Sequence, residues 1–260
     1  MRIQTGIYWS GAAGPGKNQD SLSLQHISLQ RGECLLALVC DGIGSLACSE
    51  EASGCVVHSM TDWFYHEGKM LILQNSPKEM ILLALQRQMC RLQESLKILQ
   101  RTRNIQTGTT LSGLLLIGNR YYLIHIGDSR IYRIRKRIIP ICKQKYHTVC
   151  LTKDDSSREG YLLKCLGMAG EDRVLVESGR IKRKTGFLLC TDGYYRGSQS
   201  ARIGQVLGPL LCRSGKNRRQ KVLNRQKQNR QFDRRLELLG EQAGKAGGRD
   251  HMAAVGILIG

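Results

Sequence analysis

The sequence lacks the patterns that mark several common classes of protein. No two of its 10 cysteines are spaced as Cys-x-x-Cys, which argues against a zinc ribbon and against a thioredoxin-type redox site. No apolar run approaches the roughly 18 residues of a membrane span, and residues 1–16 lack the apolar segment of a secretion signal. Internal repeats are absent. We expect a cytoplasmic protein, because free thiols without a signal segment are typical of that compartment.

Acidic residues are also scarce. The chain of 260 residues has 40 Lys and Arg against 21 Asp and Glu, a formal net charge of +19. Its hydrophobic share of 41% is sufficient for a substantial core and argues against a disordered or collagen-like chain. The positive charge favours an anionic partner. Cys34 and Cys40 flank an apolar run, so we interpret them as small core residues.

Short apolar runs predict the strands of a sheet protein. Cys34 to Cys40 is the first of them and stops at the turn dipeptide Asp41-Gly42. The other runs are Leu111 to Ile117, Tyr121 to Ile126, Ile131 to Ile134, Gly186 to Cys190 and Ala253 to Ile259. From Leu82 to Leu99, leucine and methionine recur three and four residues apart, which predicts a helix covering the sheet rather than one binding a partner helix. Residues 47–66 resemble a second covering helix.

A basic segment precedes the last strand. Residues 212–235 contain ten Lys and Arg and a single acid, Asp233, and few apolar residues. We interpret this segment as a solvated helix or an irregular insertion rather than as core. Nucleic-acid binding is a third-ranked hypothesis, because Phe232 is the only aromatic residue available there for base stacking. Such a segment can equally attract acidic phosphoprotein substrates.

Four aspartates lie at predicted strand ends. Asp41 and Asp192 each follow an apolar run and precede a glycine, whereas Asp20 and Asp250 lie just before predicted strands. In antiparallel pairing, the start of one strand lies beside the end of its neighbour, so the four carboxylates could meet at one rim. Oxygen ligands without His or Cys suit Mg²⁺ or Mn²⁺ better than Zn²⁺. Each Asp-Gly taken alone is also typical of an ordinary turn.

The order of these motifs resembles the bacterial branch of the PP2C-type, metal-dependent serine/threonine protein phosphatases. The resemblance covers nearly the whole chain. It rests on Asn18-Gln19-Asp20, Asp41-Gly42-Ile43-Gly44, Glu50-Glu51-Ala52-Ser53, Gly108-Thr109-Thr110, Gly127-Asp128-Ser129-Arg130, Leu151-Thr152-Lys153-Asp154, Leu166-Gly167, Thr191-Asp192-Gly193 and Gly247-Gly248-Arg249-Asp250.

The resemblance implies one α+β domain over residues 1–260, an αββα sandwich of two antiparallel sheets flanked by helices. It implies a protein phosphatase that hydrolyses phosphoserine and phosphothreonine with a water or hydroxide held between two Mn²⁺ or Mg²⁺ ions. By this pattern Asp41 bridges the two ions, the carbonyl of Gly42 binds one, and Asp192 and Asp250 bind the other. Asp20 holds metal-bound waters. Asp41, Asp192 and Asp250 are thus the expected catalytic residues, and no cysteine is needed as a nucleophile.

The chain also departs from the family pattern. Pro15 replaces an arginine that binds the substrate phosphate, and Lys17 is the nearest cation. A third metal site in bacterial members uses the aspartate here numbered Asp128 and a second one, whose place is taken by Arg196. Arg196 therefore argues against a third metal and, with Lys17, is a candidate phosphate ligand; Asp128 is either a turn residue or a ligand through water. Further departures are Ser45, Leu46, Ser49, His251 and Ala253.

Because of these departures from the family pattern, two functions remain possible. The first is an active phosphatase acting on phosphoproteins, with the targets of a bacterial Hanks-type kinase as natural substrates and no nucleic-acid partner. The second is a weakly active or inactive member that binds phosphoproteins as a scaffold. We expect a monomer in either case.

Overall fold

The computed structural model describes residues 3–11, 17–29, 32–136, 145–168, 173–182, 184–196, 200–212, 220–245 and 250–260; for residues 212 and 220–228 only the backbone is described. The chain divides into two compact units. The first unit comprises residues 1–14, 130–152 and 182–260, and the second comprises residues 15–129 and 153–181. The prediction of a single domain over residues 1–260 stays a prediction.

The second unit contains a five-stranded antiparallel sheet of order β2-β3-β4-β5-β8. Its strands are β2 (Asp20–Leu29), β3 (Gly32–Asp41), β4 (Leu111–Ile117), β5 (Arg120–Ile126) and β8 (Leu175–Arg180). The predicted runs at 34–40, 111–117 and 121–126 are confirmed as strands. All residues from Cys34 to Cys40 are buried, so the two thiols are core residues as predicted.

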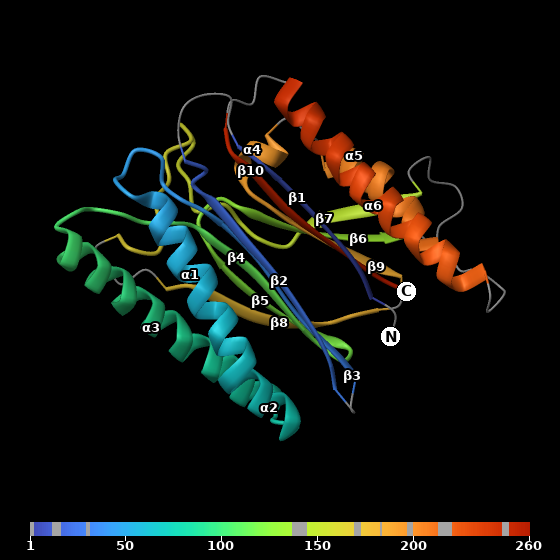
Figure 1. Cartoon of the computed structure of the whole chain (residues 1–260), viewed down its shortest axis with the longest axis horizontal. Coiled ribbons are helices and arrows are strands. Elements are labelled where there is room, and N and C mark those ends of the chain that lie inside the picture. The colour runs from blue at the N-terminus through green and yellow to red at the C-terminus, as the bar shows by residue number, and fades with distance from the viewer. Residues whose placement is uncertain are drawn as a thin grey trace. The chain divides into compact units, whose positions relative to one another are not determined.

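Helices cover one face of this sheet, as Figure 1 shows for α1 and α3. They are α1 (Ser49–Trp63), the π-helical turn η1 (Phe64–Gly68), α2 (Lys69–Leu73) and α3 (Lys78–Arg103). Leu85, Leu92 and Leu96 of α3 pack with Val56 and Met60 of α1 in one hydrophobic core. Both helices predicted from the sequence are therefore confirmed as covering helices.

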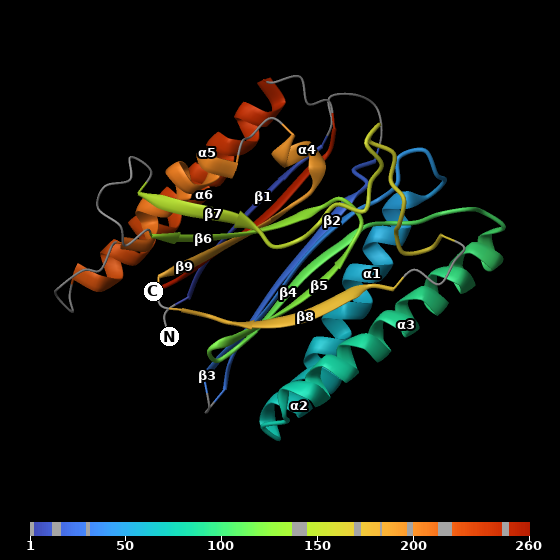
Figure 2. The same cartoon turned by 180° about the vertical axis from the view of Figure 1, so that it is seen from behind.

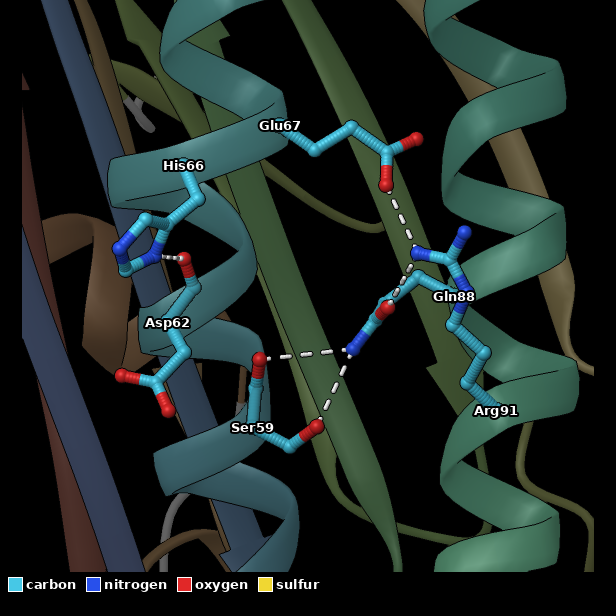
Figure 3. Close-up of polar contacts among 6 residues, drawn as sticks. All are labelled: Ser59, Asp62, His66, Glu67, Gln88 and Arg91. Carbon is cyan, nitrogen blue, oxygen red and sulfur yellow. Dashed lines mark hydrogen bonds and ion pairs between the residues drawn. The ribbon is translucent and has the colours of Figure 1, made fainter.

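Polar contacts also join α1 and η1 to α3 (Figure 3). The buried side-chain amide of Gln88 donates to the hydroxyl of Ser59 at 3.1 Å and to its carbonyl at 3.4 Å. Beside it, Arg91 forms an ion pair with Glu67 at 2.7 Å and donates to Gln88 Oε1 at 3.4 Å. A buried amide of this kind needs its partners, because an unmade hydrogen bond in a core is costly.

The first unit contains the other five-stranded antiparallel sheet, of order β1-β10-β9-β6-β7. Its strands are β1 (Ile3–Ser10), β6 (Arg130–Lys136), β7 (Tyr146–Cys150), β9 (Thr185–Cys190) and β10 (Met252–Ile259). Its helices are α4 (Asp192–Tyr195), α5 (Ser200–Leu207), the 3₁₀ turn η2 (Gly208–Cys212) and α6 (Gln220–Lys245), which Figure 2 shows from behind. Two sheets with covering helices confirm the predicted α+β class.

The basic segment lies in α6 from residue 220 onward. The interpretation that no part of this segment belongs to the core is wrong. Phe232 is fully buried and packs with Leu236 and Leu239 against the sheet, so this part of the segment is core. A Cβ at Gly256 of β10 would lie 2.5 Å from the Phe232 ring, so glycine is what lets the helix approach the strand. Arg230 and Arg234 on the opposite side are exposed, as predicted. Residues 213–219 lie outside the described residues.

Three strands were not foreseen, namely β1, β7 and β8. Each mixes polar with apolar residues, and none of their residues apart from Gly6 of β1 is fully buried. They lie at sheet edges, where one side of the strand has no partner strand. In the described part of the chain, no helix has the length and apolar character needed to cross a membrane.

Candidate active site

Asp20 and Asp41 lie directly opposite each other in the second unit, at the end of the β2-β3 pair. Asp20 is almost fully buried, with 3% of its surface exposed, and Asp41 is half-buried. The Asp20 backbone N–H donates to the side chain of Asn18 at 2.9 Å, so the Asn-x-Asp motif fixes the start of β2. The start of β2 thus lies beside the end of β3, as antiparallel pairing predicts, whereas the meeting of all four carboxylates at one rim stays a prediction.

Thr109 and Thr110 hold the backbone of Asp41 from the segment before β4. The Asp41 N–H donates to the hydroxyl of Thr110 at 3.0 Å. The Asp41 carbonyl accepts from the Thr110 N–H at 2.9 Å and from the Thr109 hydroxyl at 2.9 Å. The sequence analysis names these threonines only as part of the Gly-Thr-Thr motif and does not predict this role, although the motif was a usable signal.

Gly42 sits in a backbone cradle that excludes any side chain. A Cβ at this position would lie 2.5 Å from the carbonyl oxygen of Ser49 and 2.9 Å from that of Gln19. The Gly42 N–H donates to the same Gln19 carbonyl at 3.1 Å. Only glycine lets the chain turn this closely behind Asp41.

The thiol of Cys40 lies next to this carboxylate pair. Burial, and then the negative charges of Asp20 and Asp41, raise the pKa of Cys40 far above its usual value. A thiol held protonated in this way is a poor nucleophile. Cys40 is therefore not a candidate nucleophile at this site.

Asp192 and Asp250 form the corresponding pair in the first unit. Asp192 is 5% exposed and begins α4 just after β9 ends, whereas Asp250 is exposed and precedes β10. The two segments are joined because Thr191 and Ala253 exchange hydrogen bonds, at 3.0 Å in each direction. A Cβ at Gly193 would lie 3.0 Å from the Cβ of Asp250, so the two aspartates stand on adjacent backbone.

Both candidate phosphate ligands form ion pairs in the structure. Arg196, one helical turn after Asp192, contacts the Asp192 carboxylate. Lys17 contacts Glu50 at 3.1 Å, and this hydrogen bond raises the pKa of Lys17. A phosphate would have to compete with these carboxylates. The position of Pro15 lies outside the described residues.

Asp128 lies in the bend between β5 and β6 and is 9% exposed. Gly127 before it has φ +108°, and a Cβ there would lie 2.6 Å from the side chain of Thr110, so this bend also needs glycine. Both interpretations of Asp128, as a turn residue and as a ligand through water, remain compatible with this position.

Asp20 and Asp41 are thus neighbours in one unit, and Asp192 and Asp250 stand on adjacent backbone in the other. Among the described residues no group of three or more His, Cys, Asp or Glu side chains forms a metal cluster by itself.

Comparison with known proteins gives one family. The family described as protein phosphatase 2C matches residues 15–246. No curated protein sequence is similar enough to count as a match.

Solved structures with the same fold are bacterial serine/threonine phosphatases. Stp1 from Staphylococcus aureus has a TM-score of 0.76 at 16% identity, covering 100% of this chain and 96% of its own. The Mycobacterium tuberculosis phosphatase PstP/Ppp has a TM-score of 0.71 at 20% identity, covering 99% of this chain and 98% of its own. The catalytic domain of PstP in complex with 2 manganese ions has a TM-score of 0.72 at 20% identity, covering 99% of both chains. At these identities the likeness shows the fold, which confirms the predicted PP2C-like class.

Proposed function

Because this chain belongs to the protein phosphatase 2C family, we propose that it hydrolyses phosphoserine and phosphothreonine in proteins with two divalent metal ions. The observation that carries the proposal is the placing of two aspartate pairs at strand ends, Asp20 with Asp41 and Asp192 with Asp250. If these aspartates belonged to unrelated turns, neighbouring aspartates at strand ends would not be expected in both sheets. A manganese complex of a phosphatase with the same fold supports the choice of metal.

The residues present fit such ions. All the proposed ligands offer oxygen, from the carboxylates of Asp20, Asp41, Asp192 and Asp250 and the carbonyl of Gly42, and oxygen is what Mg²⁺ and Mn²⁺ prefer. The backbone cradle around Gly42 leaves no room for a side chain, so no side chain at this position can cover the Gly42 carbonyl. When bound there, two such ions would lower the pKa of a water molecule and neutralise charge on the phosphoryl oxygens.

The chain's own residues would then position these ligands. Thr109 and Thr110 fix the backbone of Asp41 through three hydrogen bonds, so its carboxylate does not have to be ordered when a cation arrives. Lys17 and Arg196 would supply positive charge to the substrate phosphate after release from their carboxylate partners. Lysine offers charge without the bidentate geometry of arginine, so we expect phosphate to bind more weakly than in members that keep an arginine at position 15.

A phosphopeptide assay tests the proposal. We expect the wild-type chain with Mn²⁺ to release phosphate from phosphoserine and phosphothreonine peptides, and Asp192→Asn to lose at least about a hundredfold in kcat because one ligand of the metal site is weakened. Asp62→Asn is the matched control, since Asp62 is exposed on α1. A folded wild type that binds Mn²⁺ but is no more active than Asp192→Asn would exclude the enzyme.

A second function remains a candidate. The Arg196–Asp192 ion pair occupies a proposed metal ligand, which favours a weakly active member that binds phosphoproteins as a scaffold. Binding of a phosphopeptide without turnover, in the same assay, would support that function instead. In either case the partners we propose are phosphoproteins, such as the targets of a bacterial serine/threonine kinase.

A further inference from the structure

A cavity of about 790 Å³ that is partly open to solvent lies on the second unit, far from the Asp20–Asp41 pair. Among the residues that line it are Leu29 and Gly32, which pair with each other where β2 meets β3. The aspartates occupy the other end of the same strands, nine residue steps away in the register. At about 3.3 Å per residue, this separates the two places by about 30 Å. Figure 1 shows α2 and the start of α3 at this end of the helical layer.

The sheet register explains the chemistry of the cavity. Ile117 lies opposite both Cys34 of β3 and Arg120 of β5, and cross-strand partners point to the same face of a sheet. Tyr122, two residues after Arg120, shares that face. These four side chains, together with Ile72 and Ile81 from the helices, line the cavity. The lining therefore combines apolar side chains with polar groups, and Arg120 is a cation near one end.

The hydroxyl of Tyr122 is a polar group in this cavity that lacks a partner within the described part of the chain. Tyr122 as a whole residue is only 2% exposed, but its hydroxyl is not one of the fully buried side-chain atoms without a hydrogen bond, so the hydroxyl borders the open space of the cavity. Burial raises the pKa of Tyr122, and the nearby charge of Arg120 opposes that rise. A hydroxyl that borders the cavity near a guanidinium is suited to a ligand oxygen, because both groups can donate to it.

Positive charge collects around the same place. Arg120 lies directly opposite Arg180 of β8, an arrangement that is destabilising for like charges. Lys78 also lines the cavity at the start of α3, where the helix has no side-chain cap and its N-terminus carries partial positive charge. The acids nearby are Glu79, which pairs with Lys78 at 3.2 Å, and Glu33, whose carboxylate accepts from the hydroxyl of Ser28 at 2.7 Å. Of the described residues that line the cavity, Lys78 and Arg120 are cations and none is an acid, so an anion there would be attracted.

We propose that this cavity is a second ligand site, which binds an amphipathic anion. The apolar body of the ligand lies against Cys34, Ile81 and Ile117, and its phosphate or carboxylate group contacts Arg120 and Tyr122. The site is separate from the proposed catalytic residues, so it offers the protein a way to sense a small molecule in addition to its substrate. Its volume is in the range of small-molecule sites, about 300 to 1,000 Å³.

Calorimetry with octylphosphonate tests the proposal, because its C–P bond is not a phosphate ester. We expect the full chain to bind one molecule, and to bind octanol and inorganic phosphate each at least about tenfold more weakly, since each offers one half of the recognition. Arg120→Gln should weaken octylphosphonate binding about tenfold or more, and Tyr122→Phe should weaken it several-fold. Arg87→Gln is the matched control, because Arg87 is exposed on α3 and does not line the cavity.

Two further variants keep the result unambiguous. Asp192→Asn should leave octylphosphonate binding unchanged, whereas binding at the proposed metal site would be lost with it. If Arg120→Gln does not fold, as judged by circular dichroism, the exposed Arg180→Gln must weaken binding instead. Absence of binding by the wild type, or equal affinity of Arg120→Gln and Arg87→Gln, overturns the second site, and neither result bears on the phosphatase activity.

Discussion

Arg196 contacts the carboxylate of Asp192, one of the proposed metal ligands, so a residue outside the proposed ligand set can affect metal binding. In the bacterial pattern the place of Arg196 holds an aspartate, which would add a ligand. Here an arginine brings a positive charge that neutralises Asp192 before any metal does. A divalent cation must both displace this guanidinium and approach its charge, and both effects oppose metal binding.

We therefore predict that Arg196→Gln binds Mn²⁺ more tightly than the wild type. The Arg196 side chain is 59% exposed, so solvent screens the pair and the expected gain is about two- to fivefold, as for other partly exposed ion pairs. Titration calorimetry with Mn²⁺ measures it directly, without an activity assay. Arg234→Gln, an exposed charge on α6, should leave the affinity unchanged, and unchanged or weaker binding by Arg196→Gln would show that Arg196 does not compete for Asp192.

At the scale of elements, the second unit depends on how α1, η1 and α3 are joined over the sheet. Their apolar residues form the core, and Gln88 adds a buried polar contact in which its amide reaches Ser59 (Figure 3). The Arg91–Glu67 pair lies beside it but is more exposed, with 58% and 36% of the side chains accessible. Burial should therefore decide which contact stabilises the helices more.

We predict that Gln88→Ala lowers the free energy of unfolding by about 1 to 3 kcal/mol, because it leaves a gap and removes hydrogen bonds inside the core. Arg91→Ala should lower it by about 1 kcal/mol or less, as is usual for an exposed ion pair. Urea unfolding of both variants measures the difference. An equal or larger loss for Arg91→Ala would mean that the ion pair, and not the buried amide, joins the helices.

For the molecule as a whole, the net charge of +19 is the dominant electrostatic property. Part of it is displayed on α6, where Arg230 and Arg234 are exposed while Phe232 between them is buried in the core. A surface of this sign attracts acidic polypeptides, and salt screens the attraction over about 10 Å at 0.1 M ionic strength.

This leads to a prediction that rests on the proposed phosphatase activity. The value of kcat/KM for an acidic phosphopeptide should fall several-fold as salt rises from about 0.03 to about 0.3 M, and that for a neutral phosphopeptide should fall less. Replacing both Arg230 and Arg234 by Gln should reduce the salt dependence for the acidic peptide without changing kcat. The same salt dependence for both peptides would exclude electrostatic steering by the protein.

The sequence by itself was sufficient to predict most strands and both helices that cover the sheet of the second unit. It also indicated that the start of the strand at Asp20 would lie beside a strand end such as that at Asp41. These follow from local patterns, since an apolar run or a three-and-four spacing is visible without knowing what lies across from it. The family, too, is carried by short motifs in a fixed order. Edge strands such as β7 and β8 were not predicted, because a strand with only one neighbouring strand needs no continuous apolar run.

Only the tertiary structure decided which distant groups meet. It put Phe232 of a highly basic segment into the core, joined Thr109 and Thr110 to the backbone of Asp41, and placed Tyr122 with Arg120 in a cavity. Apart from the Gly-Thr-Thr motif that contains Thr109 and Thr110, none of these contacts has a local signal. Each depends on the packing of segments that are far apart in the chain, and composition and spacing carry no record of that packing.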